Sequence, residues 1–584
     1  MMLTRMVENR GLSIILLIVL GLSAYAFVFW APFMAIDDSI SIIYNEDIKD
    51  FSRFGRVLTS SFFGDKHYYR PLVPLSFMLD YHLFGLNPAI FHLTNVLLHV
   101  LTAIVLFFLM GQIWGDRSGA FFTALLFVIH PVHSEAVSYV AGRSNILSAL
   151  FVLLAFLFFI LSWNKKGRMG WYAFSLASFF SALLAKESAV ILPILLIAYL
   201  LIIERALSSR SWVMLSSVIP YFVLIGVYVL IRHYLGIMEI HFGRAADNVF
   251  LEFTTFLNGC LTYLRLFLFP VDLYFDRAKA VYTDYTQLPV ILTWLTYAMI
   301  TVLLVRYRRY ASKYVYFFIA WFGIFLFPVS QLITSIGMQE GRIALSEHFL
   351  YGASAGIIVL MVMVARKAGA WMMKNQLCSP VVWRFFMFGI MLFLTLVTLQ
   401  QNLYVKSPIA VLKRSYAYDP QNVRVLYGLG HELALKRRFQ EASIYFRKAM
   451  AIDPNRTTST VLAHVAIANA LAEEGKLLQA IAELESIREG GELKIMVRNN
   501  LRSFYRAAIY QLKKNLQENP NDTERHLLLG RFLQKTGNAS ESMKHYHQAM
   551  ALNPDDQRPR IYVRELEDGQ SGTEATKSLL SERK

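Results

Sequence analysis

Apolar stretches long enough to cross a membrane recur along this chain of 584 residues, from residue 12 to about residue 404. A helix needs roughly 20 apolar residues to cross a hydrocarbon core of about 30 Å, and hydropathy predicts about eleven spans here. The composition agrees, because 56% of the residues are hydrophobic and only 17% are charged. The sequence therefore predicts a polytopic membrane protein. The predicted spans are residues 12–34, 89–111, 119–135, 144–163, 170–186, 189–204, 212–232, 288–305, 314–334, 348–365 and 384–404.

The positive charges between the spans predict the direction in which the chain crosses the membrane. If the N-terminus is inside, clusters such as Arg306, Arg308 and Arg309 fall in inner loops, which is the positive-inside pattern. A further apolar run at 253–275 would reverse this bias if it crossed. We therefore predict residues 233–287 as an outer loop with a membrane-hugging segment, and residues 35–88 as the first outer loop.

After residue 404 the sequence becomes polar and its pattern becomes that of a helical repeat. The dipeptide Asp-Pro at 419–420 recurs at 453–454, and Asn-Pro at 519–520 recurs at 553–554, each time after 34 residues. This is the tetratricopeptide period. Residues 405–562 are therefore predicted to form an α-solenoid on the outer face, followed by a polar, disordered tail at 563–584. The signature positions are Leu429, Gly430, Ala442, Phe446, Ala449 and Pro454 in one unit, and Leu529, Gly530, Tyr546, Ala549 and Pro554 in the last.

The net charge of +16 raises the question of a nucleic-acid partner. The Lys and Arg residues are, however, spread in short clusters between apolar runs instead of lining one face. The charge therefore reflects membrane topology, and no nucleic-acid partner is predicted.

Ionisable residues gather at the outer ends of the predicted spans, where Asp37 and Asp38 stand side by side in APFMAIDDSISII. Such groups are costly near a membrane unless they are paired or hydrated, so their collection on one face predicts a functional site. Cations can bind phosphate oxygens, and a carboxylate can act as a general base. A lone carboxylate often just marks the end of a span, and Lys186 with Glu187 could equally form a structural ion pair. The candidate phosphate ligands are Arg70, Arg143 and Arg342, then His130, His133, Lys186 and His348, with Glu135, Glu187 and Glu347 in support.

In this order along the chain, five membrane motifs and the repeats resemble the transmembrane and tetratricopeptide-repeat O-mannosyltransferases and their bacterial relatives, members of the GT-C glycosyltransferase superfamily. The motifs are IDDSISIIYNEDI, YYRPLVPLSFMLDYHLFGLNPAIFHLTNVLLH, HPVHSEAVSYVAGRSN, AKES and SEHFLYGASAG. The resemblance implies an all-α chain, in which a GT-C-like helix bundle at 1–404 precedes the repeats. It also implies that the acidic pair of the first outer loop is catalytic, which assigns Asp37 and Asp38. One of these two exposed loop carboxylates is expected to be the base, and the other to orient the acceptor or a cation.

The resemblance implies an enzyme that moves mannose or another hexose from a polyprenyl- or dolichyl-phosphate lipid to a hydroxyl of a protein acceptor. The repeats would engage the acceptor or a partner protein. Some GT-C enzymes use a divalent cation on such carboxylates, whereas the protein O-mannosyltransferases that this chain resembles are not thought to need one, so Mg or Mn remains an open cofactor. In a bacterium the chain would lie in the plasma membrane with its repeats in the periplasm or outside, and in a eukaryote in the endoplasmic reticulum with its repeats in the lumen.

Two other classes of protein could combine membrane spans with such repeats or charges. The first is a membrane-anchored repeat scaffold for secretion or envelope assembly without catalytic activity, although about eleven spans exceed what anchoring requires. The second is a transporter, for which internal repeats in the membrane part are typical. The sequence favours the transferase over both.

Overall fold

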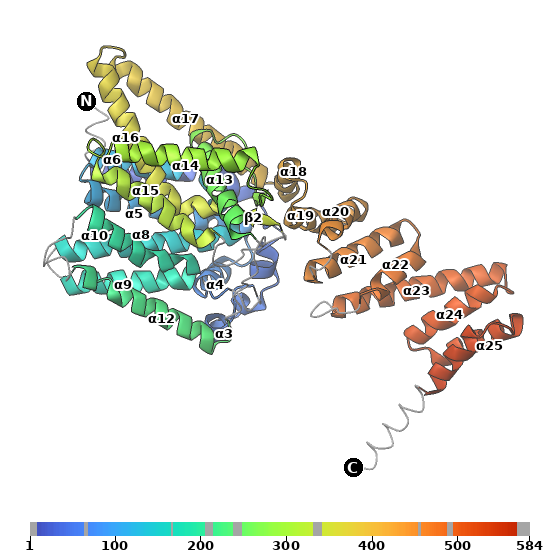
Figure 1. Ribbon diagram of the computed structural model, residues 1–584. Coiled ribbons are helices and arrows are strands. Elements are labelled where there is room, and N and C mark those ends of the chain that lie inside the picture. The colour runs from blue at the N-terminus through green and yellow to red at the C-terminus, as the bar shows by residue number, and fades with distance from the viewer. Residues whose placement is uncertain are drawn as a thin grey trace. The chain divides into compact units, whose positions relative to one another are not determined.

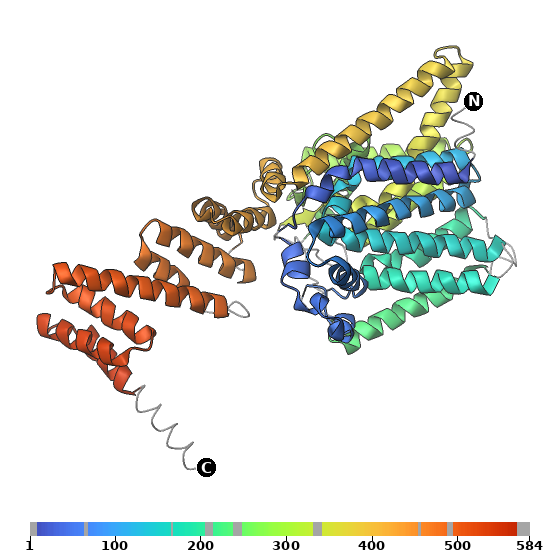
Figure 2. The same cartoon turned by 180° about the vertical axis from the view of Figure 1, so that it is seen from behind.

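The computed structural model describes residues 9–34, 36–63, 68–164, 168–204, 214–237, 248–330, 341–453, 457–487 and 494–568. These residues are helical apart from turns, loops and a two-stranded antiparallel sheet of β1 (Ala278–Ala280) and β2 (Arg342–Ala344), so the predicted all-α class is confirmed. The chain divides into two compact units, Met1–Val425 and Leu426–Lys584. Figures 1 and 2 show the helices of each unit.

The first unit contains the apolar helices, and several of the long ones lie side by side, such as α5, α8 and α9 (Figures 1 and 2). α8 is enclosed by its neighbours, because 78% of its most apolar window is buried. It is apolar around its whole circumference, as expected of a helix with no exposed face. The helices are α2 (Arg10–Ala24), α3 (Phe54–Thr59), α4 (Leu72–Phe84), α5 (Pro88–Trp114), α6 (Arg117–Ile129), α7 (Ser134–Ser138), α8 (Arg143–Asn164), α9 (Arg168–Ala185), α10 (Leu192–Ile202), α12 (Ile219–Tyr234), α13 (Val249–Leu268), α14 (Leu288–Arg306), α15 (Lys313–Leu326), α16 (Leu350–Lys374), α17 (Pro380–Val405) and α18 (Pro408–Tyr418).

Six helices within the described ranges are long and apolar enough to cross a membrane, or seven if the bent pair at 117–129 and 131–138 counts as one span. The chain is thus a multi-pass membrane protein, but the predicted eleven spans are not confirmed. Several predicted spans are broken in the structure. For example, α2 ends at Ala24 before a 3₁₀ turn. α15 ends at Leu326 and continues as a 3₁₀ turn at 327–329, which contains Pro328; a proline has no amide hydrogen to donate to the helix.

α13 falls in the predicted membrane-hugging segment and is not among the six spans found in the described residues. The Thr255 hydroxyl accepts a hydrogen bond from the Tyr282 amide at 3.1 Å. Two turns further on, the Tyr263 hydroxyl donates to the Ser346 carbonyl at 3.2 Å. α13 therefore runs along the loops that carry β1 and β2, at the end of the bundle where the candidate site lies.

The second unit is a stack of helices that follow one another in helical hairpins. Gly430 shows why the repeat signature demands small residues, since a Cβ atom there would lie 2.6 Å from the Phe446 ring. The signature residue Pro454 lies outside the described residues. The helices are α19 (Val423–Leu435), which begins in the first unit, α20 (Phe439–Ile452), α21 (Thr457–Glu473), α22 (Leu477–Glu485), α23 (Lys494–Glu518), α24 (Thr523–Lys535) and α25 (Ala539–Leu552).

Two boundaries differ from the predicted ones. The first unit extends to Val425 instead of residue 404, because polar side chains at 419–424 bind loops of the membrane part. The predicted disordered tail starts at residue 563, but residues 558–568 are helical in the structure. The rest of the predicted tail lies outside the described residues.

Candidate active site

Both backbone polar groups of Asp37, the amide and the carbonyl, are hydrogen-bonded. Its amide donates to the Tyr139 hydroxyl at 3.0 Å, and its carbonyl accepts from the amide and the hydroxyl of Ser41 at 2.9 and 2.7 Å. One carboxylate oxygen, Oδ2, receives a hydrogen bond of 2.5 Å from Nη2 of Arg424. The Asp37 side chain keeps 22% of its surface exposed, so a substrate can approach it.

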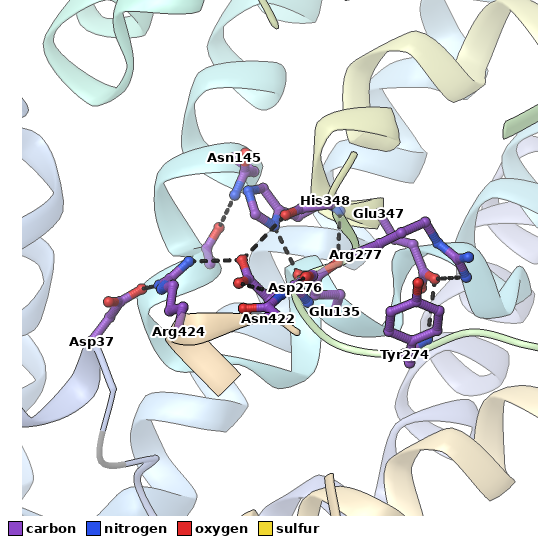
Figure 3. Close-up of polar contacts among 12 residues, drawn as sticks. Asp37, Glu135, Asn145, Tyr274, Asp276, Arg277, Glu347, His348, Asn422 and Arg424 are labelled. Carbon is purple, nitrogen blue, oxygen red and sulfur yellow. Dashed lines mark hydrogen bonds and ion pairs between the residues drawn. The ribbon is translucent and has the colours of Figure 1, made fainter. Parts of the chain in front are cut away.

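Arg424 bridges two carboxylates that are far apart in the sequence (Figure 3). Its second nitrogen, Nη1, lies 2.9 Å from Oδ1 of Asp276. Burial lowers the pKa of the Arg424 guanidinium, but the neighbouring carboxylates of Asp37 and Asp276 raise it well above its ordinary value. Asn422 adds a contact to the same loop, because its side-chain amide donates to the Asp276 carbonyl at 2.7 Å. Arg424 is therefore a fixed positive charge between two acidic groups.

Asp38 has a different environment from its neighbour. Its side chain is buried, and its two oxygens accept hydrogen bonds of 2.9 Å from the amides of Met34 and Ala141. The chain can bring Ala141 this close because Gly142 has no Cβ, which would otherwise lie 2.4 Å from the Ala136 carbonyl oxygen. The expectation of two exposed loop carboxylates is therefore wrong for Asp38, which ties the first outer loop to the turn before α8.

The burial of Asp38 makes the stability of the chain depend on pH. Burial raises the pKa of this carboxyl to about 7, against the opposing effect of its two backbone hydrogen bonds. The folded state thus binds the proton more tightly than the unfolded state, whose pKa is near 3.8. The free energy of unfolding should fall as pH rises between these two pKa values, by about 1.4 kcal/mol for each pH unit.

This prediction is tested by thermal unfolding in detergent from pH 4 to pH 8. The Asp38→Asn variant should lose the part of this pH dependence that Asp38 contributes, and at low pH it should be less stable by about 1–3 kcal/mol, since one buried amide loses its acceptor. Equal pH dependence in the parent and the variant would contradict the assignment.

Two further carboxylates lie near this network. Glu135 accepts hydrogen bonds from the ring Nδ1 and the amide of His348, at 3.0 and 3.1 Å, and from the Asp276 amide at 3.3 Å. Glu347 accepts from Nη2 of Arg277 at 3.0 Å and from the Tyr274 amide at 3.1 Å. Figure 3 shows both carboxylates beside the loop that carries Asp276. The structure thus brings the predicted residues Asp37, Glu135, Glu347 and His348 together.

Two small cavities adjoin these residues. The first is lined by both carboxylates, Glu135 and Glu347, and by aromatic side chains that include Tyr139, which binds Asp37, and Tyr274. The second is lined by Lys186 and His348, together with Asn145, Ser188 and apolar residues. Lys186 donates to the Asn145 side chain at 2.6 Å. A lysine amine and an imidazole thus line the same cavity.

The other predicted cations are already paired with protein groups. Arg70 forms a bidentate ion pair with Glu187, in which Nε and Nη2 donate to the two carboxylate oxygens at 2.9 and 2.5 Å. Glu187 is therefore bound by Arg70 and not by Lys186. Arg342 pairs with Asp419, while its Nε is a buried donor with no partner among the residues that the structure describes. Both arginine side chains are about one tenth exposed.

Arg143 is fully buried at the start of α8. Its Nη1 lies 2.7 Å from Oδ2 of Asp80, its Nε donates to the Asn95 side chain at 2.7 Å, and its Nη2 donates to the Phe91 carbonyl at 2.9 Å. The guanidinium also lies 4.5 Å from the centre of the Phe77 ring. Every nitrogen of the group therefore has a protein partner, so the geometry favours a structural role over the predicted phosphate contact.

His130 and His133 are also buried and bonded within the protein. Nε2 of His130 lies 3.1 Å from the Phe267 carbonyl. His133 bonds to the Phe127 carbonyl at 2.8 Å and to the Ser354 hydroxyl at 2.9 Å. These histidines join the bent end of α6 to α13 and α16, and their ring nitrogens are taken up by these contacts.

Three charged residues of this network were not predicted from the sequence, namely Asp276, Arg277 and Arg424. Asp276 and Arg277 lie in a loop with no recognisable motif. Arg424 lies in the first turn of a repeat helix. The repeat signature of that helix predicts a place in the solenoid, and not a contact with the membrane part. The Asp-Pro pair at 419–420 precedes that helix and predicts where it begins, but it does not indicate a contact with the membrane part.

Among the residues that the structure describes, no group of three or more His, Cys, Asp or Glu side chains is arranged to hold a metal ion. The partner of the exposed acid Asp37 is a guanidinium. An activity assay with EDTA or with added Mg or Mn decides the cofactor, which the sequence left open.

Comparison with known proteins shows what parts of this chain are similar to. Residues 70–231 match the family model described as dolichyl-phosphate-mannose-protein mannosyltransferase, and residues 423–456 match a tetratricopeptide-repeat model. The predicted resemblance to O-mannosyltransferases with such repeats is confirmed. The matched segment contains Arg70, Glu135 and Lys186 but begins after Asp37 and Asp38.

Two human proteins illustrate the extent of the similarity. Protein O-mannosyl-transferase TMTC1 is 35% identical over 173 residues, which cover 26% of this chain and 20% of TMTC1. Protein O-mannosyl-transferase TMTC3 is 24% identical over 466 residues, which cover 72% of this chain and 49% of TMTC3. The matches therefore span about half of the relatives' length or less. The crystal structure of ArnT from Cupriavidus metallidurans bound to undecaprenyl phosphate aligns with 81% of this chain and 79% of that chain, at 16% identity and a TM-score of 0.39.

Proposed function

We propose that this chain is a membrane glycosyltransferase that moves mannose or another hexose from a polyprenyl- or dolichyl-phosphate lipid to a hydroxyl group of a protein acceptor. The observation that carries the proposal is the match of residues 70–231 to the mannosyltransferase family model. The carboxylates and cations gathered at the loops of the first unit supply groups that this chemistry needs.

We assign the general base to Asp37, because its carboxylate is partly exposed whereas that of Asp38 is buried between two backbone amides. In this scheme Oδ1 of Asp37 takes the proton of the acceptor hydroxyl while Arg424 holds Oδ2. The acceptor oxygen then attacks the anomeric carbon, the bond from that carbon to the lipid phosphate breaks, and the phosphate leaves with the bonding electrons. A single displacement inverts the anomeric configuration.

Asp38 acts in this scheme as a positioning residue. It fixes the loop that carries Asp37 through hydrogen bonds to Met34 and Ala141. The cavity lined by Tyr139, Glu135 and Glu347 would take the sugar or the acceptor side chain, since aromatic faces and carboxylates are groups that sugars bind.

The lipid phosphate would meet the cations that line or flank the second cavity. Lys186 and His348 share that cavity, and Arg70 pairs with Glu187, the residue that follows Lys186. Charged hydrogen bonds to phosphate contribute about 1.5–3 kcal/mol each. Lys186→Gln should therefore weaken donor affinity about tenfold or more, with little change in acceptor affinity.

This prediction is checked by binding of dolichyl-phosphate mannose to the purified variant. Lys279→Gln is the matched control, because Lys279 donates to the Asn258 side chain outside that cavity. Unchanged donor affinity in Lys186→Gln would remove Lys186 from the phosphate site.

The outer side of the membrane is the proposed location of the reaction and of the repeats. The inner-loop cations favour this topology, and Arg424 at the start of the repeats contacts Asp37 of the first outer loop. Reporter fusions after residue 410 and within residues 40–60 should therefore both report the outside. An inside signal at residue 410 alone would mean that the chain crosses an odd number of times between the two sites.

The proposed function is tested with the purified full chain, dolichyl- or undecaprenyl-phosphate mannose, and peptides that contain Ser and Thr. Mass spectrometry should find the peptides carrying a hexose, in the presence of EDTA or of added Mg or Mn. If no polyprenyl-phosphate hexose donates a sugar under any of these conditions, the non-catalytic repeat scaffold becomes the better hypothesis.

A further inference from the structure

The first helix of the repeat array begins at the candidate active site. α19 starts at Val423, within the segment that matches the tetratricopeptide-repeat model. The second residue of the helix is Arg424, whose guanidinium binds the Asp37 carboxylate. A residue of the repeat sequence thus contacts the acid to which we assign the chemistry.

Several contacts fix the start of α19 to loops of the first unit. The Asn422 side chain caps the helix by accepting from the Val425 amide at 3.1 Å. It also donates to the Asp276 carbonyl at 2.7 Å. Just before it, Asp419 pairs with Arg342. The backbone that carries Arg424 is therefore held in place independently of the Asp37 contact.

Asp276 provides the second anchor for the guanidinium. Its carboxylate lies 2.9 Å from Nη1 of Arg424, and its backbone has a φ of +58°, which is uncommon for a residue other than glycine. Its amide donates to Glu135 at 3.3 Å. A planar guanidinium held by Asp276 on one nitrogen presents its other nitrogen to Asp37 in a fixed direction.

We propose that Arg424 is a positioning residue for sugar transfer, which holds the Asp37 carboxylate in its working orientation and so makes the start of the repeat array a part of the active site. The inference rests on the proposed function. A general base must lie within hydrogen-bond reach of the acceptor hydroxyl. A misplacement of about 1 Å can cost about 10²-fold in rate, so the orientation of Asp37 matters as much as its presence.

The test compares variants of the full chain in transfer of mannose from dolichyl-phosphate mannose to a Ser- and Thr-containing peptide. Arg424→Gln should lower kcat about 10²-fold and leave the KM for the donor within about twofold. Arg424→Lys should recover only part of the rate, because an ammonium group cannot bridge two carboxylates as a guanidinium does. Arg438→Gln is the matched control, since Arg438 lies on the same repeat and pairs with Glu441 at an exposed site; it should behave as the parent.

Two further measurements separate positioning from mere folding. Thermal unfolding gives the folded fraction, and kcat is expressed per folded molecule. The double variant Arg424→Gln with Asp37→Asn should be no slower than Asp37→Asn alone, because a residue that acts through Asp37 has no effect once the base is lost.

The outcomes are distinguishable. If the parent transfers sugar and folded Arg424→Gln matches Arg438→Gln, the positioning role is overturned while the proposed function stands. A faster Arg424→Gln would mean that the guanidinium masks Asp37, and rate losses that multiply in the double variant would mean that Arg424 acts elsewhere. An inactive parent would overturn the proposed function itself.

Discussion

Replacing Asp37 with asparagine is expected to lower turnover by about 10²–10⁴-fold, the range that general-base catalysis contributes. The amide has the shape of the carboxylate but cannot take the proton of the acceptor hydroxyl. The Asp37 amide and carbonyl keep their bonds to Tyr139 and Ser41, since these use backbone atoms. The variant should therefore fold and bind the donor lipid as the parent does.

The measurement is the rate of mannose transfer from dolichyl-phosphate mannose at saturating donor and peptide. Asp50→Asn is the matched control in the same predicted loop, because the Asp50 side chain is half exposed and caps a short turn, which asparagine can also do. A parental rate for Asp37→Asn would exclude Asp37 as the base and would leave its pair with Arg424 as a structural contact.

The second large effect concerns stability. Arg143→Ala is expected to destabilise the folded chain by about 3–5 kcal/mol, because removing one member of a buried ion pair leaves the other uncompensated. Asp80, the partner, is itself 6% exposed, and Arg143 is completely buried. The variant also loses the hydrogen bonds to Asn95 and Phe91. This outcome differs from that of a phosphate ligand, whose loss would weaken donor binding without unfolding the chain.

Thermal unfolding in detergent measures this effect directly. Arg265→Gln provides the comparison, since its pair with Asp272 is exposed at 43% and 26% and should contribute within about 1 kcal/mol. If Arg143→Ala unfolds like the parent but binds dolichyl-phosphate mannose more weakly, the predicted role of Arg143 at the donor phosphate is restored.

The two units differ in how far their sequences predicted them. The repeats were predicted well, because contacts such as that of Gly430 with Phe446 recur at a fixed spacing within one repeat. The number of spans was not predicted well, since hydropathy does not indicate where a helix ends in a 3₁₀ turn, as α2 does at Ala24. Apolar character fixes which segments enter the membrane part but not how each segment bends inside it.

The sequence by itself determined the membrane class, the repeats and the position of the acidic pair, because these depend on composition and on spacings of a few tens of residues. Only the tertiary structure decided which acid is exposed and which is buried, since Asp38 owes its environment to Ala141, about 100 positions away. The same holds for the bridge from Asp37 through Arg424 to Asp276, whose members are separated by 387 and 148 positions. Hydrogen bonds and ion pairs act over about 3 Å in space whatever the distance along the chain, so the residues that complete this site became visible only once the chain was folded.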